Sequence, residues 1–182
     1  GAERVMLDIA EYLSNQGHQV TFFLLEPVVD YKVPNNIQTL VLYKTGKRTT
    51  FTNLFHLKHT AKDMIALVKS VEKKQGEFNL HLSNLDSTNQ VLNRCHFKNT
   101  YYVIHNAISQ EIKRAKKVQL LRYLRVIREK KVLNGKKLIA VSKGIEQEVV
   151  SNGFIKPASI ETIYNPCDIE KIREMALRDN PN

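Results

Sequence analysis

Helix-like and strand-like segments alternate along the whole chain, and this alternation constrains the fold more than any other feature. The opening stretch, "GAERVMLDIAEYLSNQGHQVTFFLL", sets the pattern. Apolar residues at Val5, Ile9 and Leu13 lie on one helical face, Gly17 ends the helix, and an apolar, β-branched and aromatic strand follows. Strands of this kind are typical of parallel sheets buried on both faces. The sequence therefore predicts an α/β fold, with a mostly parallel sheet flanked by helices.

The same alternation continues to the end of the chain. Further strands are expected between helices, at residues 37–43, 78–85, 100–106, 137–142 and 159–166. Because parallel strands are joined through a crossover, the opening helix also calls for a strand before Gly1, about a dozen residues long with its loop. We expect residues 1–178 to form one domain and residues 179–182 a linker or tail.

Composition is that of a globular protein without a membrane span. The 182 residues are 42% hydrophobic, which suffices for one buried core. No stretch reaches the roughly 18 consecutive apolar residues of a spanning helix. The two cysteines, Cys95 and Cys167, lie far apart, and no histidine stands at metal-ligand spacing from them. We therefore expect reduced thiols, no metal site and a cytoplasmic location.

The net charge of +10 is concentrated in one segment. Residues 113–137 contain eleven basic residues and one acid, so the rest of the chain carries no net charge. Apolar residues within this segment follow helical spacing, namely Leu120, Tyr123, Leu124 and Ile127. The spacing predicts a basic amphipathic helix with these side chains on one face.

Three interpretations of this helix stay open. It can pack on the core with a solvated basic face, bind an anionic lipid surface or acceptor, or run along nucleic acid. Nucleic acid is the least favoured, because exposed aromatic residues are not interleaved with the basic ones. The candidate contacts to a membrane or an anionic acceptor are Arg122, Arg125, Arg128, Lys130 and Lys131.

Polar residues come directly after several predicted strands. Ligands of parallel α/β sheets bind at the carboxyl ends of the strands, so these positions are the candidate site. They are Gly1 in the loop before the first helix, Asn84, His105, Asn106, Ser142 and Asn165. Polar residues at strand ends also cap helices, and the two roles are equal alternatives for Ser83, Asp86 and Ser142.

Three blocks of the sequence resemble the retaining glycosyltransferases of family 4. The opening block is similar to the family's Gly-Gly-Ala-Glu-Arg helix and the strand that follows it. "YYVIHN" stands where the family has a strand ending in histidine. "LIAVSKGIEQEVVSNGFIKPASIETIYNPCDIEKI" is similar to the segment in which one strand ends in Ser-Lys and a later one in an Asn-Gly or Asn-Pro turn. The blocks keep the family's order and span nearly the whole chain.

This resemblance implies the amino-terminal, acceptor-side half of a two-domain GT-B enzyme. Such an enzyme moves a sugar from a nucleotide-sugar donor to a glycan or lipid-linked acceptor with retention, and it uses no cofactor. The donor would be bound mainly by a second domain beyond Asn182, so we expect the chain alone to be inactive. By the same resemblance, Gly1 faces the donor diphosphate, His105 is catalytic, Asn106 lines the acceptor pocket, and Asn165 lies near the interdomain cleft.

The sequence also departs from the family pattern. The family's paired donor-binding glutamates belong to the second domain, and Glu3 and Glu11 share only their spacing. A histidine expected near Ser83 is displaced to His81, and Cys167 replaces a small or β-branched residue. We expect a hexosyltransferase of cell-surface polysaccharide or lipopolysaccharide biosynthesis, peripheral on the inner face of the cytoplasmic membrane. The alternatives are a nucleotide-sugar epimerase-like GT-B protein and a basic nucleic-acid-binding module.

Overall fold

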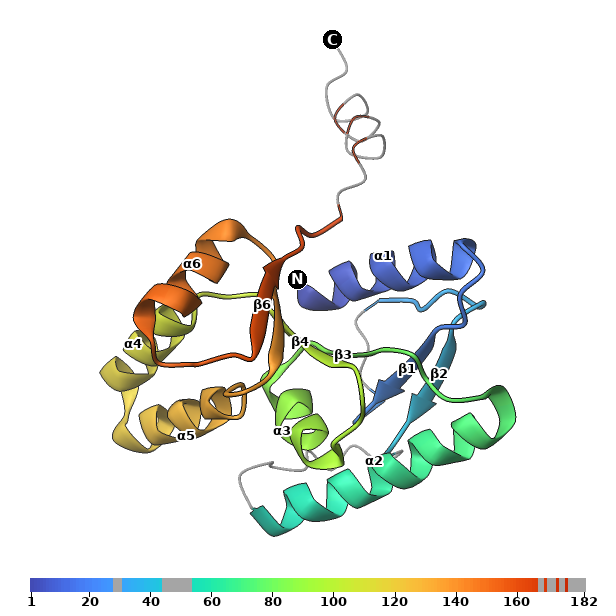
Figure 1. The fold of residues 1–182 in the computed structure, drawn as a ribbon, viewed down its shortest axis with the longest axis horizontal. Coiled ribbons are helices and arrows are strands. Elements are labelled where there is room, and N and C mark those ends of the chain that lie inside the picture. Colours follow the sequence, from blue (N-terminus) through green and yellow to red (C-terminus); the bar gives the residue numbers. More distant parts are fainter. Residues whose placement is uncertain (28–30, 44–53, 167–168, 170–172, 174–175, 177–182) are drawn as a thin grey trace.

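The computed structural model describes residues 1–27, 31–43 and 54–166, together with 169, 173 and 176 (Figure 1). Helices and strands alternate through these residues. In chain order they are α1 (Ala2–Asn15), β1 (Thr21–Leu24), β2 (Gln38–Val41), α2 (Leu54–Gln75), β3 (His81–Ser83), α3 (Asp86–Cys95), β4 (Thr100–Ile104), α4 (Ile108–Val118), α5 (Leu120–Lys131), β5 (Lys137–Ala140), α6 (Lys143–Asn152) and β6 (Ser159–Thr162). The end predicted for the domain, residue 178, and the predicted tail lie outside the described residues.

All the strand pairs described are parallel. β1 pairs with β2, and a second sheet has the order β3-β4-β5-β6. In the second sheet Ser83 lies opposite Tyr102, and Ile104 opposite Ala140. Figure 1 shows α1 and α2 on opposite sides of β1 and β2. The predicted α/β class, with parallel strands flanked by helices, is confirmed.

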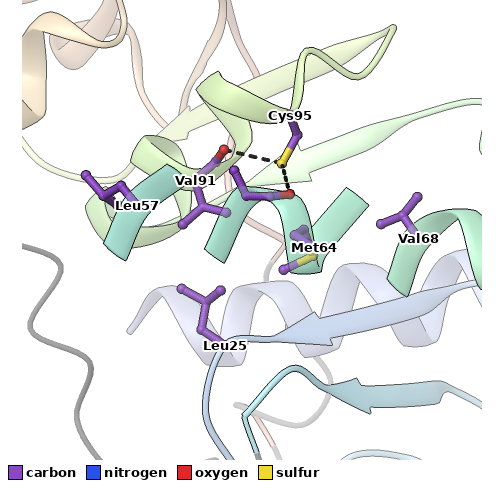
Figure 2. Close-up of a cluster of buried hydrophobic side chains, with 7 residues drawn as sticks. Leu25, Leu57, Met64, Val68, Val91 and Cys95 are labelled. Carbon is purple, nitrogen blue, oxygen red and sulfur yellow. Dashed lines mark hydrogen bonds between the residues drawn. The ribbon is translucent and has the colours of Figure 1, made fainter. Parts of the chain in front are cut away.

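Two clusters of buried side chains form the core. The first joins α2 and α3 to the end of β1, with Leu57, Val68 and Val91 almost fully buried (Figure 2). The second gathers around β4 and β5, where Tyr102 and Ile104, two residues apart, point to the same side. Most residues of both clusters recur at helical spacing along a helix or at every second position along a strand. Their packing holds the helices against the strands.

Cys95 belongs to the first cluster and is a free, buried thiol. Its Sγ contacts the carbonyl oxygens of Val91 and Ala61, at 3.3 and 3.7 Å (Figure 2). Burial raises the pKa of the thiol to about 11. Cys95 is therefore protonated at neutral pH and serves as an apolar core residue. Cys167 lies outside the described residues.

A glycine follows the end of α1, as predicted, and another follows the end of α6. Gly17 and Gly153, at φ +86° and +64°, come just after α1 and α6, in the left-handed region that glycine adopts without strain. The basic segment, by contrast, is not one helix. Gln119 is extended, with φ −164° and ψ 141°, and separates α4 from α5. Among the described segments, no helix is both long and apolar enough to cross a membrane.

The sheet is interrupted between β1 and β3. Within the described residues no backbone pairing joins these two strands, so each keeps one unpaired edge. Side chains nevertheless connect them: the ring of Phe78 lies 5.6 Å from Phe23 of β1 and 5.8 Å from His81 of β3. Unpaired edges of a parallel sheet leave backbone donors and acceptors unsatisfied. We propose that the strand expected before Gly1 pairs with β1 and β3 at this place.

Hydrogen exchange tests this proposal on a protein extended by its upstream residues. Backbone pairing would slow exchange of edge amides in β1 and β3 by at least about tenfold. The outer strands β2 and β6 serve as controls, and their exchange is expected to stay unchanged. Equal exchange in β1 and β3 with and without the extension would contradict the proposal.

Candidate functional site

The carboxyl ends of β3 and β4 bring Asn84 and His105 together. Each residue directly follows its strand, and the parallel register places both at the same edge. Nε2 of His105 lies 3.2 Å from Oδ1 of Asn84. An amide oxygen only accepts hydrogen bonds, so Nε2 carries the proton and donates it. Nδ1 is then the acceptor nitrogen of the ring.

His105 is half-buried, and its surroundings favour the neutral imidazole. Burial lowers the pKa of His105 from its ordinary value of 6.5. The backbone nitrogen of Gly1 lies within electrostatic reach of His105. The structure therefore gathers three of the predicted site residues, Gly1, Asn84 and His105, at one place.

Gly1 precedes a helix whose first turn carries no side-chain cap. A Cβ at Gly1 would meet no atom of the described residues within 4 Å. The first amides of a helix have no partner within the helix, and its dipole favours negative charge there. The amino end of α1 is thus suited to an anionic group such as a phosphate.

The amino ends of α4 and α6 are already occupied by side chains. Glu148 of α6 accepts a hydrogen bond from the Ser109 amide of α4, at 2.7 Å. Burial disfavours its charged form, but the hydrogen bonds from Ser109 and neighbouring groups hold the pKa of Glu148 below its ordinary value. Ser142 accepts from the Ile145 amide at 3.3 Å. Ser142 is therefore a helix cap, and its place in the cleft stays a prediction.

The remaining predicted strand-end residues differ in burial. Asn106 is exposed in the loop before α4, and Asn165 is exposed beyond the end of β6. Ser83 is buried and donates to Oδ1 of Asn89, at 2.6 Å, which fixes the end of β3 against α3. This bond supports Asn84, the next residue along the chain.

Lys130 does not face the solvent as predicted. It is 6% exposed, and its Nζ contacts both carboxylate oxygens of Asp86, at 2.8 and 2.9 Å, and the carboxylate of Glu111. Burial disfavours the ammonium, but the two carboxylates raise the pKa of Lys130 above its ordinary value. The assignment of Lys130 to a membrane or an anionic acceptor is therefore wrong. It instead ties α5 to the first turns of α3 and α4.

The other candidate basic residues of this segment differ in exposure. Arg122, Arg125 and Lys131 are exposed, whereas Arg128 is half-buried. Arg125 also forms an ion pair with Glu129, at 2.8 Å.

The apolar residues predicted to share one face of this segment differ in exposure. Tyr123 and Ile127 turn inward, but Leu120 and Leu124 are exposed. Lys130 is a polar residue, yet it is bound on the inward side of α5. The inward face of α5 therefore differs from the face that the apolar spacing defines.

A separate pocket lies at the opposite edge of the sheet. It measures about 180 Å³ and includes the first residues of β4 and β5, Thr100 and Lys137, with His96 and Lys136 beside them. Neither His105 nor Asn84 lines it. In the part of the chain that the structure describes, no group of three or more His, Cys, Asp or Glu side chains is arranged to hold a metal ion.

The lowered pKa of His105 predicts a specific pH dependence of stability. Below pH 6.5 His105 is protonated in the unfolded chain more readily than in the folded protein. The free energy of unfolding therefore falls as the pH decreases. In urea denaturation over a pH series, His105→Gln should remove part of this loss. Equal slopes for wild type and His105→Gln would contradict the assignment.

Comparison with known proteins bears on the family and the fold of this chain. The sequence profile of Glycosyltransferase Family 4 matches residues 1–171. No curated protein sequence gave a significant match. Among solved structures, sucrose-phosphate synthase from Thermosynechococcus elongatus has a similar fold, with a TM-score of 0.55 and 16% sequence identity over 96% of this chain and 91% of that chain. The chain therefore belongs to Glycosyltransferase Family 4 and has the Rossmann-like fold of a GT-B glycosyltransferase.

Proposed function

We propose that this chain is the acceptor-side domain of a retaining hexosyltransferase. The enzyme moves a sugar from a nucleotide-sugar donor to a glycan or lipid-linked acceptor. Family membership supports glycosyl transfer in general. The observation that carries the proposal for this chain is the neutral His105, held by Asn84 beside Gly1 at the carboxyl edge of the sheet.

The roles of these residues follow from the charges that develop during transfer. The leaving nucleoside diphosphate is negative, and the open amino end of α1 at Gly1 offers it unpaired backbone amides. The anomeric carbon becomes positive as its bond to the diphosphate breaks. A neutral imidazole can accept a hydrogen bond from a sugar hydroxyl at Nδ1 without placing a second cation beside that carbon. This is the catalytic role assigned to His105.

The site is an exposed sheet edge, and the proposal requires a second domain to close over it. Asn106 and Asn165 are exposed at the same edge, where they can line the acceptor side and the interdomain cleft. The second domain would hold most of the donor. On this account the chain by itself transfers no sugar.

We further assign the enzyme to cell-surface polysaccharide or lipopolysaccharide biosynthesis, in the cytoplasm and at the inner face of the membrane. Exposed basic residues of α5 support this location, because each Lys or Arg near an anionic leaflet contributes about 1 kcal/mol of attraction. Those residues are Arg122, Arg125 and Lys131.

A donor panel on the complete polypeptide, including its second domain, tests the proposal. Transfer and hydrolysis are measured for a range of nucleotide sugars, with membrane lipids supplied as acceptors. Loss of the imidazole in His105→Ala should lower turnover about 100-fold or more. The matched control His59→Ala, at an exposed histidine of α2, should leave turnover unchanged.

Three other outcomes would overturn the proposal. Conversion of the donor into an epimer without transfer would indicate the epimerase-like alternative. Tight, salt-sensitive oligonucleotide binding that is unaffected by His105→Ala would indicate a nucleic-acid-binding module. Undiminished transfer in His105→Ala would remove the catalytic role of this histidine.

A further inference from the structure

Four large apolar side chains are exposed where α4 meets α5. Val118, Leu120, Leu121 and Leu124 have 65%, 69%, 71% and 53% of their surface open to solvent. They fall within seven consecutive positions, and we call them the α4–α5 corner. Single exposed leucines are common on protein surfaces, but a contiguous apolar group marks an interaction site.

The outward orientation of these leucines is fixed by the inner face of α5. Lys130 is bound to Asp86 and Glu111, and Tyr123 and Ile127 lie on the same inward side of the helix. At 100° per residue, Leu121 lies opposite this inner face. The buried ion pairs therefore hold α5 in the orientation that exposes the corner.

Positive charges surround the corner. Lys116 and Lys117 are exposed at the end of α4, and Arg122 and Arg125 are exposed on α5. An apolar group flanked by Lys and Arg is the arrangement that seats a helix in the interface of an anionic bilayer. There the leucines reach the acyl chains while the cations stay among the headgroups.

We propose that the α4–α5 corner inserts into the surface of an anionic membrane. The charges argue against the two other occupants. A second copy of the chain would bring its own cluster of cations against this one. A nucleic acid would neutralise the cations but would leave the leucines in water. The inference deepens the proposed membrane location, and its test requires no glycosyl transfer.

The proposed insertion also specifies how the membrane contact is linked to the site. Lys130 joins α5 to Asp86, two residues after Asn84, and to Glu111, six residues after His105. The inserted helix is thus bound directly to the helices that follow both site residues. A lipid-linked acceptor, one of the two acceptor classes of the proposed function, would enter the site from the membrane on which the corner is seated.

A single tryptophan reports insertion directly, because the chain contains none. Leu121→Trp is compared with Val150→Trp, which replaces a residue of α6 that is 63% exposed. Vesicles of phosphatidylcholine with and without phosphatidylglycerol are added, some with brominated acyl chains. We expect a blue shift and bromine quenching for Leu121→Trp with anionic vesicles. Val150→Trp should show neither. An unshifted, unquenched Leu121→Trp, or equal changes in both variants, would overturn the proposal.

Charge and apolar variants then separate insertion from simple attraction. Leu121→Ser/Leu124→Ser and Lys117→Glu/Arg122→Glu should each weaken vesicle binding by about tenfold or more in sedimentation. The matched control Lys73→Glu/Lys74→Glu makes the same charge change on exposed positions of α2 and should have a much smaller effect. Binding that depends on charge but not on the leucines would contradict insertion. These results are independent of donor turnover, so the failure of one proposal leaves the other testable.

Discussion

Parallel strand pairing is the constraint on which the rest of this structure depends. A parallel strand cannot be followed by a tight hairpin turn, so each crossover carries the chain back along the sheet, and the ends of successive strands meet at one edge. Asn84 and His105, twenty-one positions apart in sequence, come into contact because β3 and β4 pair in this way. The opposite edge holds a pocket with lysines but none of the residues gathered around His105. Pairing thus decides which polar residues become a site and which stay on the surface.

Buried charge is the second organising element. Taking Lys130 out of water is costly, and only the carboxylates of Asp86 and Glu111 offset that cost. Three helices are held together by these contacts, and two of them begin just after Asn84 and His105. The same contacts determine the rotation of α5 and therefore which leucines face outward. One interaction consequently supports both the candidate glycosyl-transfer site and the proposed membrane contact.

Much of this architecture could be predicted from the sequence, because the strands are short apolar runs and the helices end at glycines such as Gly17 and Gly153. The contact of Asn84 with His105 also follows, once the strands are taken as parallel. The features that the sequence does not predict arise from contacts between residues far apart along the chain. Helical spacing predicted that Leu120 and Leu124 share a face with Tyr123 and Ile127, but it could not predict that Lys130 is buried and that both leucines are exposed. Glu148 reaches the amino end of α4 from a helix that comes thirty-nine positions later, a distance at which local sequence gives no signal.

We propose that a nucleotide sugar binds at the carboxyl edge of the sheet, against α1 and His105. The most direct measurement is a crystal structure of the complete polypeptide with a non-hydrolysable nucleotide-sugar analogue. We predict that the diphosphate lies at the amino end of α1 beside Gly1, with a sugar hydroxyl within hydrogen-bond distance of His105, about 3 Å. An analogue bound in the pocket beside His96 and Lys136, or held without contact to His105, would contradict the account.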